Sequence, residues 1–187
     1  MVTWIFSITL LIVLVWRSSF AQNQFRGILP NFIANLSTQL KSLTMGSNMI
    51  RGSIPIGIGN LVNLNLLGLE GNYLGGPLPN ILRKLQNLEG LYLNDNEFSG
   101  LIPSSLGNLT VLTKLYLEEN KFEGSIPPNL GNCKKLLILN LSSNNLNGTI
   151  PKQVFGLSSL WSCLIKIKLF PNKLVLKKWF VAHFYST

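Results

Sequence analysis

The sequence predicts an α/β-type repeat solenoid, a curved superhelix with a parallel β-sheet on its concave face and short helical or irregular segments on its convex side. Three observations predict it. Asparagine, glycine and proline each recur every 24 residues between positions 48 and 151. Leucine-rich apolar positions recur at the same spacing, and each unit contains an apolar-x-apolar triplet. Such self-similarity, at a period of roughly 20 to 50 residues, is the signature of units that stack into a solenoid.

Each repeat is expected to contribute one short strand. In the triplet LYL the two leucines point to one side and the tyrosine to the other, because side chains alternate along a strand. One repeat cannot bury its apolar side alone, but strands stacked about 4.8 Å apart close a continuous core. The expected solenoid spans residues 22–160, with a partial repeat at 23–35, full repeats at 36–60, 61–84, 85–108, 109–132 and 133–156, and the start of another at 157–160.

Each strand is expected to end in a turn built on asparagine. The amide both donates and accepts hydrogen bonds, so it satisfies backbone groups that a bending chain leaves unpaired. Glycine follows four residues later and fits a tight return, and proline follows at seven, where no backbone donor is required. The expected ladder consists of Asn48, Asn72, Asn96, Asn120 and Asn144.

The two ends depart from this pattern. Residues 1–21 contain an apolar run from Trp4 to Trp16, followed by the small residues around Ala21, and are expected to be a secretory signal peptide or an uncleaved membrane anchor. This segment also fits the repeat spacing, with only Ser18 out of place among the strand positions. Residues 161–187 form a basic, apolar tail that matches no closing cap.

The complete unit is LxxLxxLxLxxNxLxGxIPxxLGN, best preserved from Leu109 to Asn132. It resembles the plant type of leucine-rich repeat, in which GxIP marks the extracellular class. The stretches IANLSTQLKSL and GSIPIGIGNL are similar to extracellular domains of receptor-like kinases, in the branch that includes immune pattern receptors. The resemblance implies a non-catalytic module that binds a peptide or protein ligand, with a co-receptor as a further partner, at the cell surface or outside the cell.

Two other interpretations stay open. The chain also resembles the polygalacturonase-inhibiting proteins of the same repeat class, which are secreted inhibitors of cell-wall-degrading enzymes. The third interpretation is a truncated gene product without independent function, because neither end carries the cap that members of the family usually have.

The exposed strand and turn positions predict a ligand-binding surface. Tyr92 and Tyr116 occupy the same position in adjacent repeats, with acids beside them and lysines at the margin. Exposed tyrosines beside charges are typical of binding surfaces. Five full repeats give a face about 25 Å long, enough for about seven residues of extended peptide. The candidates on the concave face are Tyr73, Tyr92, Asn94, Asp95, Glu97, Lys114, Tyr116, Glu118 and Lys121.

Four N-x-Ser/Thr sequons are candidate glycosylation sites, which agrees with passage through the secretory pathway. They are Asn35, Asn108, Asn140 and Asn147.

Other chemistries are not expected. The stretch LYLNDNEFSG, residues 91–100, resembles the start of a calcium loop, but Leu106 stands where the bidentate glutamate is required, so no metal or cofactor is expected. The lone His183 and the absence of nucleophile or phosphate-loop motifs argue against an enzyme. The tail supplies five of the net charge of +9, through Lys166, Lys168, Lys173, Lys177 and Lys178, and no basic stripe in the body of the chain favours nucleic acid. Cys133 and Cys163 are expected to be apolar fillers.

Overall fold

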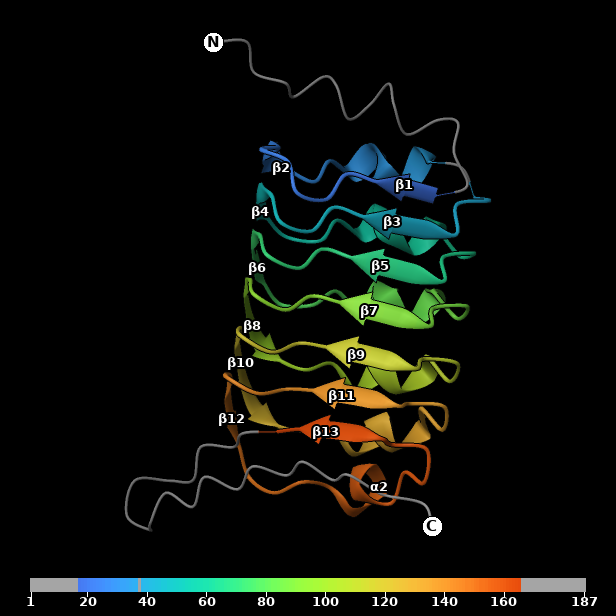
Figure 1. The fold of residues 1–187 in the computed structure, drawn as a ribbon, viewed down its shortest axis with the longest axis vertical. Helices are drawn as coiled ribbons and strands as arrows, with labels where there is room; N and C mark the ends of the chain where they lie inside the picture. Colours follow the sequence, from blue (N-terminus) through green and yellow to red (C-terminus); the bar gives the residue numbers. More distant parts are fainter. Residues whose placement is uncertain (1–16, 37, 166–187) are drawn as a thin grey trace.

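Seven short parallel strands stack one after another along the molecule (Figure 1). They form what we call the inner sheet, which confirms the predicted repeat architecture. The computed structural model describes residues 17–36 and 38–165. The strands of the inner sheet are β1 (Arg17–Ser19), β3 (Ser42–Thr44), β5 (Leu66–Gly68), β7 (Gly90–Tyr92), β9 (Lys114–Tyr116), β11 (Ile138–Asn140) and β13 (Ser162–Leu164).

Equivalent residues of successive repeats lie directly beside one another in the inner sheet. Ser42 pairs with Leu66, Leu66 with Gly90 and Gly90 with Lys114, so that partners are 24 residues apart. The strand register therefore equals the sequence period. We call each set of equivalent residues a column and each repeat a rung.

The apolar columns form one continuous core. In each strand of the inner sheet from β3 to β13 the middle residue is buried, for example Leu67, Leu91 and Leu115. Deeper in the core the rings of Phe98 and Phe122 stack with centroids 6.2 Å apart. Because each rung buries its apolar side against the next, stability is expected to depend on contacts between neighbouring repeats.

The predicted asparagine ladder is confirmed. The Asn96 Nδ2 donates to the carbonyl of Leu69 in the preceding repeat (2.9 Å) and to those of Leu93 (3.3 Å) and Asn94 (3.2 Å) in its own. Its Oδ1 accepts from the Leu74 N–H at 3.0 Å. The same pattern recurs at the other ladder positions, so each buried amide joins two repeats and leaves none of these backbone groups unpaired.

A backbone bend precedes each ladder asparagine. The residue there takes a left-handed conformation, with φ of 53° at Asp95, 54° at Glu119 and 62° at Gly71. This bend directs the chain away from the inner sheet and into a second parallel sheet, along the left edge of Figure 1. The strands of the second sheet are β2 (Arg26–Ile28), β4 (Met49–Gly52), β6 (Tyr73–Gly76), β8 (Glu97–Leu101), β10 (Lys121–Ser125) and β12 (Asn145–Asn147).

The second sheet is absent from the sequence-based expectation. Strands β4, β6, β8 and β10, such as KFEGS at 121–125, each contain a single buried apolar residue and a glycine with positive φ, so they lack the alternation by which strands are found. Its register also differs. Ser99 pairs with Lys121 and Glu123 with Asn145, so that partners are 22 residues apart. Each rung of the second sheet is therefore shifted by two residues relative to the repeat.

Short helices cover the side opposite the inner sheet, as expected (Figure 1). Each recurring proline, such as Pro103 with φ −70°, stands at the N-cap of one helix, where its missing N–H has no partner to lose. The helices are η2 (Asn31–Asn35), η3 (Ile56–Asn60), η4 (Asn80–Lys84), η5 (Ser104–Asn108), η6 (Pro128–Asn132) and α2 (Lys152–Phe155).

The inner sheet extends beyond residues 22 and 160, the limits that the sequence predicts for the solenoid. Arg17 pairs with Ser42 in β3, and Leu164 pairs with Asn140 in β11. Strands β1 and β13, at the two ends of the described chain, therefore pair with the neighbouring repeats in the same way as the strands between them. The reason is that backbone pairing requires the spacing of the repeat and not a leucine at each position; the buried Cys163 takes the leucine place in β13.

Two predictions fall mainly outside the described residues. The apolar run at 4–16 and the tail residues 166–187 are among those not described, so the signal peptide or membrane anchor and the membrane association stay predictions. Among residues 17–36 and 38–165, none of the helices has the length and apolar character that crossing a bilayer requires.

Candidate ligand-binding surface

Two tyrosines stack on the exposed face of the inner sheet. Tyr92 of β7 and Tyr116 of β9 are register partners, and their rings lie with centroids 5.1 Å apart and planes 15° apart. We call them the tyrosine pair. Both are half-buried, and burial raises the pKa of each phenol, with Glu70 raising that of Tyr92 further. The sequence prediction that they share one column is confirmed, and the stack gives a rigid aromatic surface.

The ring of Tyr92 needs the glycine that precedes it by two residues. A Cβ added at Gly90 would stand 2.8 Å from the Tyr92 ring. Real Cβ atoms essentially never come so close, so the ring lies over Gly90 only because Gly90 has no side chain. This glycine therefore positions one of the two rings.

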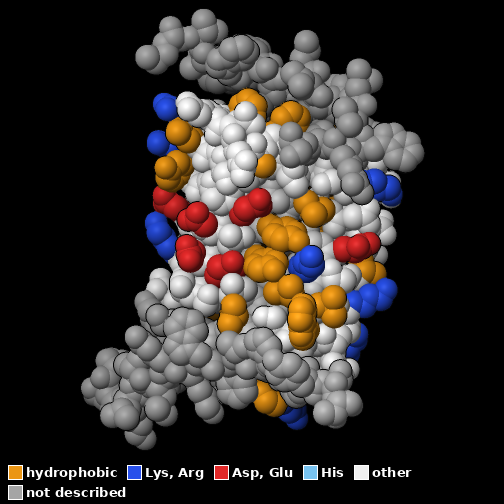
Figure 2. All heavy atoms as spheres, viewed as in Figure 1, with side chains coloured by type: hydrophobic (Ala, Val, Ile, Leu, Met, Phe, Trp, Pro, Cys, Tyr) orange, Lys and Arg blue, Asp and Glu red, His pale blue; other side chains and the backbone are white. Residues whose placement is uncertain are grey.

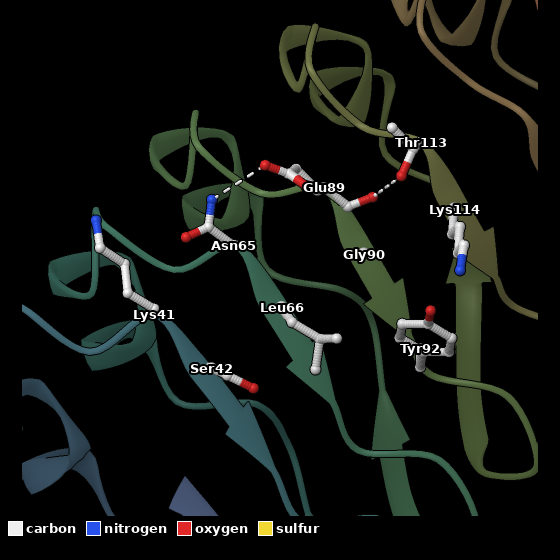
Figure 3. A pocket seen from close by; sticks show the side chains of 9 residues that line it. All are labelled: Lys41, Ser42, Asn65, Leu66, Glu89, Gly90, Tyr92, Thr113 and Lys114. Atoms are coloured by element: carbon white, nitrogen blue, oxygen red, sulfur yellow. Dashed lines mark hydrogen bonds between the residues drawn. The ribbon is translucent and has the colours of Figure 1, made fainter. Parts of the chain in front are cut away.

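A hollow of about 520 Å³ lies beside Tyr92, over the beginnings of strands β3 to β9. Figure 3 shows Glu89 between its hydrogen-bond partners, where Asn65 Nδ2 donates to its Oε1 (3.3 Å) and the Thr113 hydroxyl donates to its carbonyl (2.8 Å). Lysines stand near either end of the hollow, and small residues leave its floor open. The lining residues are Lys41, Ser42, Asn65, Leu66, Glu89, Gly90, Tyr92, Thr113 and Lys114.

Acidic side chains border the other side of the tyrosine pair. Figure 2 shows acidic side chains gathered beside the central apolar ones on this face. The carboxylate of Glu70 lies over Gly46 and Gly68, where Cβ atoms would leave it no room. Burial raises the pKa of Glu118, and Glu119 adds to the rise, while hydrogen bonds to its own backbone and to Asn140 oppose it. The face is therefore apolar and aromatic in the middle and acidic along one side.

Six of the nine predicted site residues lie on this side of the fold. Tyr92 and Tyr116 form the tyrosine pair, Lys114 and Glu118 lie beside it, and Asn94 lies half-buried between Glu70 and Glu118 in the column that these three residues share. Asp95 is exposed and occupies the left-handed bend before Asn96, so the backbone turn determines where its side chain starts.

The other three predicted residues do not share the concave face. Tyr73, Glu97 and Lys121 begin the second-sheet strands β6, β8 and β10, because the bend before the ladder asparagine turns the chain away. Lys121 Nζ lies 3.0 Å from the Glu97 Oε2, both well exposed. The Arg51 guanidinium lies over the Tyr73 ring, 5.6 Å from its centroid. These residues form a separate surface.

Several residues of the face were not among the sequence candidates. Lys41, Asn65, Glu89 and Thr113 line the hollow from a single column, the position just before each strand. A column of mostly polar residues at a constant place in every repeat is the signal that could have found them. Gly90 gave no signal, because its contribution is an absent side chain.

Comparison with known proteins agrees with this architecture. The family described as Leucine Rich Repeat matches residues 39–61, 87–109, 111–133 and 135–157. A solved structure of the BIR3–SERK2 complex from Arabidopsis thaliana contains a chain that is 34% identical over 71% of this chain and 70% of that one, with a TM-score of 0.63. The chain belongs to the leucine-rich-repeat family.

Two other similar proteins are plant receptor kinases. Over 48 residues, 26% of this chain, it is 58% identical to the LRR receptor-like serine/threonine-protein kinase EFR of Arabidopsis thaliana, of which the match covers 5%. The Arabidopsis receptor kinase HAESA, solved in complex with the peptide hormone IDA and the co-receptor SERK1, is 34% identical, with a TM-score of 0.77, over 81% of this chain and 25% of that one. The chain thus spans a small part of these receptors.

The leucine-rich repeats place the four sequons differently. Asn35 and Asn108 are exposed at the ends of η2 and η5, and Asn147 is half-buried in β12. Asn140 is buried in β11, where its Oδ1 accepts from the Ser142 hydroxyl (2.8 Å). A glycan on Asn140 would have to displace these contacts, so the structure disfavours that site.

The described repeats hold no group of three or more His, Cys, Asp or Glu residues able to bind a metal ion. LYLNDNEFSG folds as β7, the bend and the start of β8. Cys133 and Cys163 are free and buried, and burial raises the pKa of each thiol to about 11, which confirms their expected role as apolar fillers.

Proposed function

We propose that this leucine-rich-repeat module binds an extended peptide, or an extended segment of a partner protein, on the inner sheet around the tyrosine pair. The observation that carries the proposal is the stacked, half-exposed pair of Tyr92 and Tyr116 beside a hollow of about 520 Å³. Aromatic side chains with polar tips supply much of the contact energy at binding surfaces, because they bury a large area with few rotatable bonds.

The dimensions of the face favour a peptide over a small molecule. Seven strands at about 4.8 Å per step give a length of roughly 29 Å, which corresponds to about eight or nine residues of extended chain. The hollow is open and shallow, with Lys41 and Lys114 toward its ends and Leu66 in its floor. A linear ligand running along the rungs would contact equivalent positions of successive repeats in turn.

The relatives support the same role. HAESA is a receptor kinase solved with a peptide hormone and a co-receptor, and EFR is a receptor-like kinase. We therefore propose that the chain acts in ligand perception as part of a receptor-like extracellular domain, that it carries no catalytic function itself, and that a co-receptor is its second partner. Immune or developmental signalling is the corresponding pathway class.

A peptide selection tests the binding proposal. The full chain is immobilised and exposed to a display library of random nine-residue peptides, and enriched peptides are then measured against variants. Tyr92→Ala and Tyr116→Ala are expected to weaken binding by about tenfold each, as removal of an interface aromatic commonly does. Tyr73→Ala, on the second sheet, is the matched control and should leave binding unchanged. Enriched peptides that bind the double tyrosine variant as well as the wild type would refute the proposal.

An extracellular location is part of the proposal and has its own test. The chain is expressed in plant cells and treated with an endoglycosidase. Asn108→Gln, at an exposed sequon, should remove one glycan and increase gel mobility, whereas Asn140→Gln should leave glycosylation unchanged. A wild-type chain without any mobility shift would contradict passage through the secretory pathway.

A further inference from the structure

We infer that the peptide ligand carries two cationic side chains four residues apart, with an apolar side chain midway between them. This rests on the proposed function, because the binding surface is the face around the tyrosine pair. It adds the charge, the conformation and the spacing of the ligand. The inference comes from how two carboxylates stand relative to the two rings.

Glu70 and Glu118 bracket the tyrosine pair along the solenoid. Glu70 leans toward the earlier rungs, since its carboxylate lies over Gly46 and Gly68. Glu118 leans toward the later rungs, since its side chain hydrogen-bonds to Asn140 of β11. The order along the inner sheet is therefore carboxylate, ring, ring, carboxylate.

Both carboxylates lack a complete set of donors. The Oε2 of Glu70 and the Oε2 of Glu118 are each buried, and no group in the described part of the chain donates a hydrogen bond to either. The ion pair between Lys121 and Glu97 lies on the second sheet and leaves them unneutralised. A partly buried acceptor without a donor costs free energy, which a bound ammonium or guanidinium group would recover through a charge-assisted hydrogen bond.

The spacing of the two carboxylates fits an extended peptide. Glu70 lies between the rungs of β3 and β5, and Glu118 between those of β9 and β11, a separation of about three rungs or roughly 14 Å. Four residues of extended chain at about 3.3 Å each span roughly 13 Å, and residues i, i+2 and i+4 face the same side. Side chains i and i+4 then reach the carboxylates while i+2 lies over the tyrosine pair.

The net positive charge of the protein confines the preference for a cationic peptide to the acidic part of the surface. The formal net charge is +9, so a cationic peptide is repelled at long range and gains only where acids gather. All seven acidic residues lie between Glu70 and Glu123, and Figure 2 shows several of them grouped beside the central apolar side chains. Binding of a cationic peptide would therefore indicate contact with this face rather than attraction to the overall charge of the protein.

Designed peptides test the inference with the full chain. The first has seven residues with blocked ends, lysine at the second and sixth positions, leucine at the fourth and threonine elsewhere. The second has the same composition with lysine at the second and fifth positions, which places one lysine on the wrong side of an extended chain. Dissociation constants are measured by titration calorimetry against wild type, Glu70→Gln, Glu118→Gln and Glu123→Gln, the last being the matched loss of charge on the second sheet.

The first peptide is expected to bind about five- to tenfold more tightly than the second, and to lose a similar factor with Glu70→Gln or Glu118→Gln, as one charge-assisted contact at a partly buried position would give. Glu123→Gln should change little. Equal affinities for the two peptides, or unchanged affinity in both glutamine variants, would overturn the inference. If selected library peptides still depend on Tyr92, the proposed function survives that result; if they do not, both fail.

Discussion

The ring of Tyr92 lies against the backbone of Gly90, where a Cβ would stand 2.8 Å from the ring. Gly90→Ala is therefore expected to push the ring off its stack with Tyr116 while leaving the strand in place, because the φ of Gly90 is not in the positive region. The near-ultraviolet circular dichroism of the tyrosine pair should fall toward that of Tyr92→Ala, and peptide binding should fall with it. An alanine variant that keeps the wild-type spectrum would contradict this role of Gly90.

Asn96 is expected to be far more important for stability than its neighbour Asn94. Asn96→Ala leaves the buried N–H of Leu74 unpaired and removes one of the donors from each of three carbonyls, at a cost of about 2–4 kcal/mol. Asn94→Ala removes a half-buried side chain of the inner face and should cost less than about 1 kcal/mol. Urea unfolding of both variants measures the difference. Equal effects would mean that the ladder amide has no special role.

Glu119 adopts a left-handed conformation that a glycine would adopt more easily. Glu119→Gly should stabilise the fold by about 0.5–1 kcal/mol, because relief of the left-handed strain exceeds the entropy that glycine loses on folding. Gly71 occupies the equivalent bend two repeats earlier. Glu123→Gly, in the extended strand β10, is the control and should destabilise by about 0.5–1 kcal/mol. The test is the opposite sign of the two changes in unfolding free energy.

Glu118 is expected to make stability depend on pH. Burial is the largest cause that raises the pKa of its carboxyl above the ordinary value of 4.5, so the ionised form is disfavoured in the folded state. The resulting penalty is present in full above the raised pKa and disappears as the pH falls below 4.5. Glu118→Gln should therefore be more stable than wild type at neutral pH, with the gain shrinking as the pH is lowered. A gain that grows on acidification would reverse the expected sign.

The inner sheet, its core and the ladder could be predicted because each depends on a spacing. A register equal to the repeat brings Tyr92 beside Tyr116 without further information. The second sheet could not be predicted, since it depends on a backbone bend whose residue varies among Ser47, Gly71 and Asp95. For the same reason Tyr73, Glu97 and Lys121 were assigned to the wrong face.

The hollow was equally difficult to predict. It depends on what is missing at Gly90 and on lysine and glutamate side chains that precede the strands rather than lie in them. Sequence patterns report which residues recur, whereas the shape of a surface depends on differences between rungs. The placement of Glu70 and Glu118 on either side of the tyrosine pair could not be predicted either, because Asn94 separates them in their column.

The two sheets also differ in how the pairing of their strands relates to the length of the repeat. On the inner sheet, paired residues are one repeat length apart, so each column contains the equivalent residues of successive repeats. A substitution there changes one position in one column and leaves the pairing of the other residues unchanged. On the second sheet, paired residues are 22 positions apart in the sequence, so the neighbours of any residue come from different places in the repeat. Duplication of a whole repeat therefore adds one strand to the inner sheet and keeps all existing neighbours side by side. Recognition on that face can thus be extended one repeat at a time.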